Sequence, residues 1–93
     1  MDANLRKLYR LMQQILIIVI EGMELERLPQ DMVSAEALGV SEHFRANVLR
    51  MMRDGGLIEG RLIEGRELAA INLQPTLDGL EWLEYIREKL KSG

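Results

Sequence analysis

Cysteine is absent from the 93-residue chain, and histidine occurs only once. The first absence excludes disulfide bonds, thiolate metal ligands and cysteine nucleophiles, and the second leaves zinc almost no side chains to bind. We therefore expect no metal site and no cofactor. The lack of cysteine also agrees with a reducing compartment.

Long apolar runs and targeting signals are missing as well. The longest apolar run, Ile15 to Ile20, has six residues, whereas a membrane-spanning helix needs about 20. The N-terminus reads Met-Asp-Ala-Asn and has no signal-peptide pattern. Together these absences predict a cytoplasmic protein without a membrane segment.

A strong positive charge is lacking too. The net charge is −3 and the pI is about 5.2, whereas strong nucleic-acid binders are usually basic. The charge is unevenly distributed, because residues 41–66 contain five arginines and four acidic residues, a net charge of +1, while the rest of the chain carries −4. Any DNA-facing surface is therefore expected in this middle third.

The chain does contain enough apolar sequence for one core. Hydrophobic residues make up 47% of it, but only four residues are aromatic, so aliphatic side chains and the six methionines must fill the interior. The length predicts a single domain over residues 1–93.

A first helix is predicted from about Asn4 to Glu21. Its apolar side chains recur at helical spacing, at Leu5, Leu8, Met12, Ile15, Leu16 and Val19. Ile17 falls on the opposite, polar side, and Ile18 lies at the edge. Two interpretations stay open: the helix is covered on two sides by its own chain, or these isoleucines form a dimer contact.

Two serines mark the starts of the next helices. Ser34 is a suitable N-cap for a short helix over 35–38, and Ser41 is one for a helix over 42–54. Met32-Val33, just before them, is predicted as a short strand.

In the helix over 42–54 we expect an inward face of Phe44, Val48, Met51 and Met52, with Leu49 at its margin. The outward face is expected to hold Glu42, His43, Ala46, Asn47, Arg50 and Arg53, with Arg45 at the border.

A hairpin is predicted next, from a five-residue repeat. Leu57-Ile58-Glu59-Gly60-Arg61 recurs as Leu62-Ile63-Glu64-Gly65-Arg66. Because the repeat has odd length, its two copies would face opposite sides of one continuous strand. A bulge at Gly60 would restore the phase and put Ile58 and Ile63 on one face. We expect strands near 57–63 and 68–73, with a tip near 64–67.

A final helix is predicted over about 77–90, with Thr76 as its cap. Its inner stripe is Gly79, Leu83, Ile86 and Leu90, and Gly79 would let another backbone approach closely. Trp82 flanks this stripe, and Tyr85 lies on the other side.

The order of these elements predicts an α+β fold that is mostly α. Two helices joined by a short glycine-containing turn form a helix-turn-helix over about 34–54. The hairpin over about 57–73 would be a wing, and the helix over about 77–90 would close the domain. This arrangement is a winged helix.

Two stretches resemble a known family. Leu38-Gly39-Val40-Ser41, Phe44 and residues 48–60 resemble the second half of many winged-helix domains, and Thr76 to Leu83 resembles their Thr-x-x-Gly-aliphatic-x-aromatic-Leu closing helix. Together, over about residues 4–90, they resemble the YjcQ-like family of small winged-helix proteins associated with phages and prophages. The resemblance implies the fold and a phage-like setting, and it assigns no activity and no site residues.

No catalytic constellation is recognisable. His43 is expected on the solvent side without the partner and pocket that a general base needs. The carboxylates form no pair that can be placed across a cleft, and the glycines follow helices or lie in the hairpin instead of forming a phosphate loop. We therefore expect no enzyme.

The helix-turn-helix offers a mechanism for binding duplex DNA. The N-terminal half of its second helix would enter the major groove, and the side chains reaching base edges would be His43, Ala46 and Asn47, with Asn47 able to pair with adenine. Those nearer phosphates would be Arg45, Arg50 and Arg53, and the hairpin arginines reaching the backbone or minor groove would be Arg61 and Arg66. The acidic residues that oppose this are Glu42, Glu59, Glu64 and Glu67.

Two function hypotheses stay open. The first is a DNA-binding transcriptional regulator of the phage or prophage type. The second is a non-catalytic interaction module that docks to a second copy of the chain, or to a phage or host protein, through Ile17, Ile18 and Tyr85. The acidic pI suits the second hypothesis.

Overall fold

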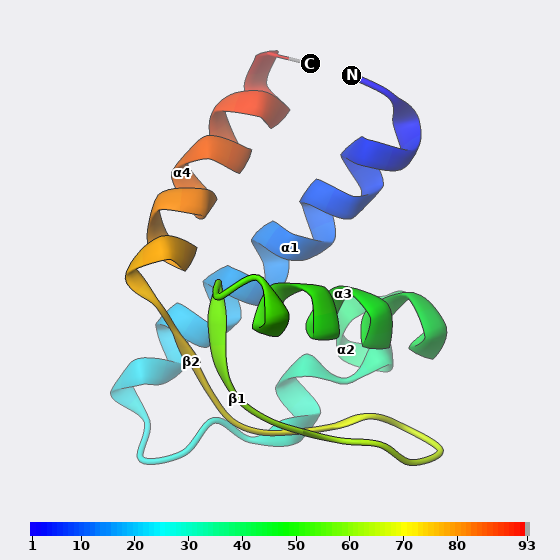
Figure 1. Ribbon diagram of the computed structural model, residues 1–93, viewed down its shortest axis with the longest axis vertical. Helices are drawn as coiled ribbons and strands as arrows, with labels where there is room; N and C mark the ends of the chain where they lie inside the picture. Colours follow the sequence, from blue (N-terminus) through cyan, green and yellow to red (C-terminus); the bar gives the residue numbers. More distant parts are fainter. Residues whose placement is uncertain (93) are drawn as a thin grey trace.

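The computed structural model describes residues 1–92. Its elements, in chain order, are α1 (Ala3–Glu21), the 3-10 helices η1 (Gly22–Glu24) and η2 (Gln30–Val33), α2 (Ala35–Leu38), α3 (Glu42–Asp54), β1 (Ile58–Ile63), β2 (Ala69–Pro75) and α4 (Leu77–Ser92). The two strands form one antiparallel hairpin. The fold is α+β and mostly helical, with the layout of a winged helix, as the sequence predicts (Figure 1).

The predicted N-caps are confirmed. The hydroxyl of Ser34 accepts a hydrogen bond from the backbone N–H of Ala37 at 3.1 Å, and that of Ser41 accepts one from Phe44 at 3.1 Å. Thr76 caps α4 in the same way, since its hydroxyl accepts from the N–H of Gly79 at 2.9 Å. Each cap satisfies an amide that the first helical turn leaves unpaired, which is why these boundaries can be read from local sequence.

The strand predicted at Met32-Val33 is wrong. These residues end the 3-10 helix η2, and the Val33 side chain is fully buried in the core. Their backbone groups are used within the 3-10 helix and by α3 instead, since the N–H of Met32 donates to the Pro29 carbonyl at 3.1 Å and the Val33 carbonyl accepts from Arg45 Nε.

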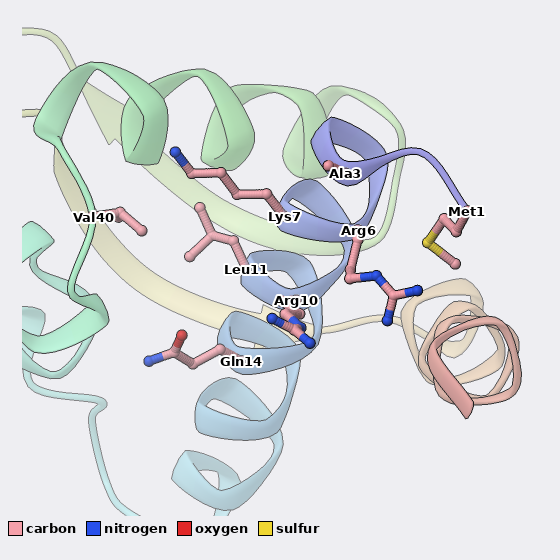
Figure 2. A pocket seen from close by; sticks show the side chains of 8 residues that line it. All are labelled: Met1, Ala3, Arg6, Lys7, Arg10, Leu11, Gln14 and Val40. Carbon is pink, nitrogen blue, oxygen red and sulfur yellow. The ribbon is translucent and has the colours of Figure 1, made fainter. Parts of the chain in front are cut away.

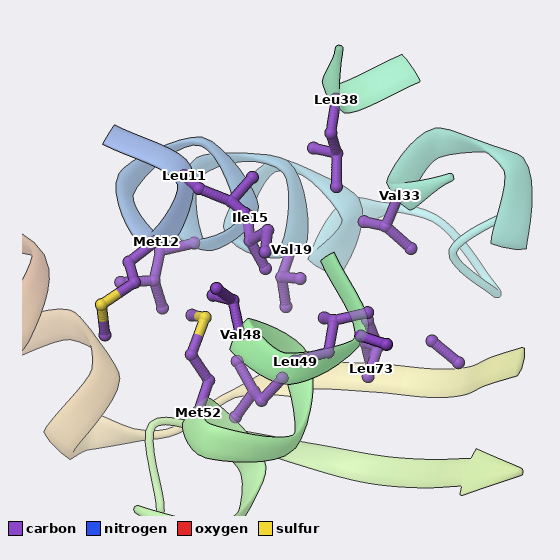
Figure 3. Packing of buried hydrophobic residues seen from close by; sticks show 14 of the residues in the cluster. Leu11, Met12, Ile15, Val19, Val33, Leu38, Val48, Leu49, Met52 and Leu73 are labelled. Atoms are coloured by element: carbon purple, nitrogen blue, oxygen red, sulfur yellow. The ribbon is translucent and has the colours of Figure 1, made fainter. Parts of the chain in front are cut away.

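The core is organised around α1, which packs against α4, α3 and β2. Leu11, Ile15 and Val19 of α1 point towards Val48 and Leu49 of α3 (Figure 3). The predicted apolar stripe is confirmed for Met12, Ile15, Leu16 and Val19, all at most 4% exposed, whereas Leu5 near the chain end is exposed.

The buried face of α3 includes residues that were predicted outside it and leaves out one that was predicted inside it. Ala46 and Leu49 are buried, whereas Met51 is 45% exposed. The helix is rotated because the wing and η2 cover the side that carries Arg45, while the side that carries Met51 borders a surface groove. Ala46 is therefore unavailable to reach a base edge, contrary to the prediction.

A bulge lies at Gly60, as predicted, but its additional residue belongs to the opposite strand. Glu59 pairs with Gln74 and Arg61 pairs with Ile71, so β2 contributes one more residue than β1. Gly60 has a φ of 141°, and a Cβ there would lie 2.9 Å from the Ile71 carbonyl oxygen. This register keeps Ala70 and Leu73 of β2 both buried.

Because the additional residue is in β2, the alternation along β1 is not reset. Ile58 is 1% exposed and Ile63 is 43% exposed, so the two do not share the buried face that the sequence predicts for them.

The closing helix α4 packs on α1 through Gly79, Leu83 and Ile86, as predicted. A Cβ added at Gly79 would lie 2.1 Å from the Leu57 carbonyl oxygen, so only glycine fits where the backbone before β1 crosses α4. The N-terminus and the end of α4 lie at the same end of the molecule, and the hairpin tip lies on the side of the N-terminal end of α3 (Figure 1).

Candidate nucleic-acid interface

The outward face of α3 carries a connected row of polar side chains. The Asn47 amide nitrogen lies 3.4 Å from His43 Nε2, and Arg50 Nη1 donates to Asn47 Oδ1 at 3.2 Å. His43 and Asn47 are exposed, and the Arg50 side chain is 38% exposed. The structure therefore brings together three of the residues that the sequence predicts at the DNA surface.

Arg45 does not belong to this surface, and its prediction as a phosphate contact is wrong. Its side chain is only 4% exposed. Its Nη1 donates to Glu42 Oε1 at 2.8 Å and to the Leu68 carbonyl at 3.0 Å, and its Nε donates to the Val33 carbonyl. Arg45 therefore joins α3 to η2 and to the base of the wing.

Glu42 completes the same arrangement. Its Oε2 accepts a hydrogen bond from the backbone N–H of Leu68 at 2.7 Å. Both Glu42 and Arg45 thus hold the residue just before β2, and we call this group the α3–wing clamp (Glu42, Arg45, Leu68 and Val33). Because the carboxylate of Glu42 is neutralised inside the clamp, it repels an approaching phosphate less than its sequence position indicates.

A second link joins α3 to the wing tip. Glu64 accepts two parallel hydrogen bonds from Arg50, from Nε at 3.0 Å and from Nη2 at 2.7 Å. These hydrogen bonds hold the pKa of the Glu64 carboxyl below its ordinary value of 4.5. Arg53 is paired as well, since its Nη2 lies 3.2 Å from Asp54 Oδ1.

The two arginines of the wing, Arg61 and Arg66, differ from Arg50 and Arg53 in their surroundings. Arg61 lies on β1 and Arg66 at the hairpin tip, and both are exposed. Neither forms an ion pair with any residue in the described range 1–92. Their charges are therefore available to a negatively charged ligand on the wing side of α3.

A further set of cations, on α1, was missed by the sequence reasoning. A groove of about 430 Å³ is lined by Arg6, Lys7 and Arg10 of α1 and by Val40, which lies at the turn before α3 (Figure 2). Lys7 extends towards α3, and its Nζ lies 5.1 Å from the centre of the Phe44 ring. The available signal was the absence of acidic residues between Asp2 and Glu21, which gives this helix a local charge of +3 up to Ile20.

Residues 1–92 contain neither a metal-binding cluster nor a membrane-spanning helix. That stretch has no group of three or more histidine, cysteine, aspartate or glutamate side chains arranged to hold a metal ion. None of its helices combines the length and the hydropathy that crossing a bilayer requires.

Comparison with protein families matches residues 13–88 to YjcQ, described as "YjcQ protein". The chain belongs to the YjcQ family. The matched range includes all of α3 and the hairpin, and therefore the His43–Asn47–Arg50 row, whereas Arg6, Lys7 and Arg10 precede it. No curated protein and no solved structure shows a significant match to the chain.

The predicted oligomer contacts of this YjcQ-family chain are only partly exposed. Ile17 and Ile18 are half-buried and pack against the chain's own core, which favours the interpretation that α1 is covered on two sides by its own chain. Tyr85 is 43% exposed on α4. The three residues therefore do not form one exposed apolar patch.

Removing the Arg45 guanidinium should destabilise the fold strongly. Arg45→Met leaves Glu42 and two backbone carbonyls without their donor, so the free energy of unfolding should fall by about 3 kcal/mol. Urea denaturation followed by circular dichroism measures this change. Arg53→Met, which removes a half-exposed pair, should cost less than about 1 kcal/mol. Equal stability of the two variants would contradict the α3–wing clamp.

The Arg50–Glu64 pair should appear in the titration of Glu64. Since the pKa of Glu64 is lowered, the pair favours the folded state above pH 4.5, and this contribution is lost as the pH falls through the lowered pKa. Carboxyl NMR of Arg50→Gln should show the Glu64 pKa returning to its ordinary range. Arg61→Gln, the control, should leave it lowered, and an unchanged value in Arg50→Gln would show that the pair does not form in solution.

Proposed function

We propose that the chain is a small DNA-binding protein that acts as a transcriptional regulator of the phage or prophage type. The observation that carries this proposal is the exposed row of His43, Asn47 and Arg50 along α3. In a helix-turn-helix the second helix enters the major groove with its N-terminal residues towards the bases. His43 and Asn47 occupy that half of α3, and an asparagine amide can pair with adenine through two hydrogen bonds.

Cations on both sides of α3 support the same orientation. Arg61 and Arg66 extend the surface along the wing, and Lys7 extends it along α1, next to Phe44. A duplex docked on α3 has a phosphate backbone on each side of the major groove, so these side chains are suited to contact both backbones. This local arrangement compensates for the net negative charge of the chain.

The Arg50–Glu64 pair gives the surface a built-in competitor. A carboxylate and a phosphate both accept two parallel hydrogen bonds from a guanidinium. Glu64 therefore occupies the Arg50 donors that a DNA phosphate would use. Binding DNA would replace the Glu64 carboxylate on Arg50 by a phosphate, which lowers the affinity for DNA of arbitrary sequence. Base contacts by Asn47 and His43 would then supply the additional affinity for a specific sequence.

Charge variants at this pair test the proposal. With Lys7, Arg50, Arg61 and Arg66 each contacting one phosphate, log affinity should fall with log salt with a slope of about −3.5. Arg50→Gln should weaken binding to a random-sequence duplex pool about tenfold, and Glu64→Gln should strengthen it several-fold because Arg50 loses its competitor. Fluorescence anisotropy measures both effects.

The matched control is Glu84→Gln, which removes the same charge from the exposed side of α4. It should change the affinity much less than Glu64→Gln does. Absence of binding at low salt, or a flat salt response, would overturn the proposal.

The second candidate function, a non-catalytic interaction module that pairs with another copy of the chain, rests on α4. Leu80 and Tyr85 are 39% and 43% exposed there. Sedimentation velocity at high protein concentration should then show a dimer, and Tyr85→Asp should convert it to a monomer. A wild-type chain that is already monomeric would exclude this function for α4. Ile17→Asp is a poorer probe, since Ile17 packs against the core.

A further inference from the structure

A second, larger groove lies on the side of α3 that carries Met51. It has a volume of about 760 Å³ and is bounded by α1, the C-terminal end of α3 and the start of α4. Leu5, Leu8 and Met12 of α1 line one wall, and Leu57 lies where the chain passes from α3 to β1. Its size is in the range of small-molecule sites in proteins.

Three of the four aromatic side chains of the chain meet at this groove. The rings of Trp82 and Tyr85 are stacked, with centroids 4.7 Å apart and an interplanar angle of 25°. Tyr9 meets both rings edge-on, at 6.2 and 6.3 Å. The Trp82 Nε1 atom is buried and has no hydrogen-bond partner within residues 1–92, so one donor of this cluster is unused.

The charged side chains that line the groove are both acidic. Asp78 and Glu81 come from the first two turns of α4, and no lysine, arginine or histidine is among the lining residues. The aromatic cluster already attracts a cation from outside the groove, because Lys89 Nζ lies 5.5 Å from the centre of the Tyr85 ring. Aromatic faces and carboxylates both favour positive charge.

We propose that this groove binds a planar aromatic cation. Such a ligand would place its ring against the Tyr9–Trp82–Tyr85 cluster and its positive charge near Asp78 and Glu81. Apolar contacts with Leu8 and Met12 would bury the rest of its surface. The proposal does not depend on DNA binding, although Met51 and Leu57 would let the ligand contact the end of α3 and its connection to the wing.

Two compounds with the same ring skeleton but different charge show whether the groove selects its ligand by charge or by shape. At pH 7.5, 9-aminoacridine is a cation, whereas acridine is neutral. Trp82 is the only tryptophan, so quenching of its emission reports binding directly, and calorimetry supplies the stoichiometry. We expect one 9-aminoacridine per chain, quenching of Trp82, and an affinity at least tenfold higher than that of acridine.

Charge variants show whether the acidic residues select the ligand. Glu81→Gln should weaken 9-aminoacridine binding about threefold or more and leave acridine binding unchanged. Glu88→Gln, an exposed position of α4 outside the groove lining, makes the same charge change and should have little effect. Tyr85→Ala should weaken the binding of both compounds, since it removes a stacked ring.

Three outcomes would overturn the proposal. One is the absence of binding by either compound. Another is equal affinity for both, which would mean that the groove accepts apolar rings without regard to charge. The third is an equal loss of affinity in Glu81→Gln and Glu88→Gln, which would mean that the overall charge of the chain, and not the groove, attracts the cation.

Discussion

The ion pair between Glu42 and Arg45 is the interaction on which the shape of the proposed binding surface depends. It joins three segments that are distant in sequence, α3, η2 and the base of β2, through a nearly inaccessible guanidinium and two backbone carbonyls. A buried ion pair adds little net stability over an apolar replacement, but it is costly to break and is specific in direction. It therefore sets the angle between α3 and the wing, and with it the relative positions of Asn47 and Arg61.

Local physical chemistry explains the part of the fold that could be predicted. The starts of α2, α3 and α4 depend on a hydroxyl and the amide three residues later, so the sequence suffices to find them. The close approach at Gly79 was predictable for a similar reason, because no other residue type needs so little space. The rotation of α3 about its own axis could not be predicted from the sequence, because it depends on which tertiary neighbours cover Ala46 and leave Met51 exposed.

The candidate site, too, has one part that could be predicted from the sequence and another that could not. His43, Asn47 and Arg50 share a face because of helical periodicity alone, and the prediction of their grouping is confirmed by the structure. The partner of Arg50 lies 14 residues further along, and finding it requires the hairpin register, which shifts at the bulge. Lys7 was missed because charge was summed along the sequence, whereas α1 crosses behind α3 in space.

The repeated pentapeptide of the wing has a consequence for how its length can vary. Identical residues occupy unlike environments in the two copies, as Ile58 is enclosed and Ile63 faces solvent. Gain or loss of a single five-residue unit would exchange inward and outward positions for everything that follows up to Leu68, whose backbone the clamp holds. Homologous wings that differ in reach should therefore differ by an even number of residues, or carry a compensating bulge.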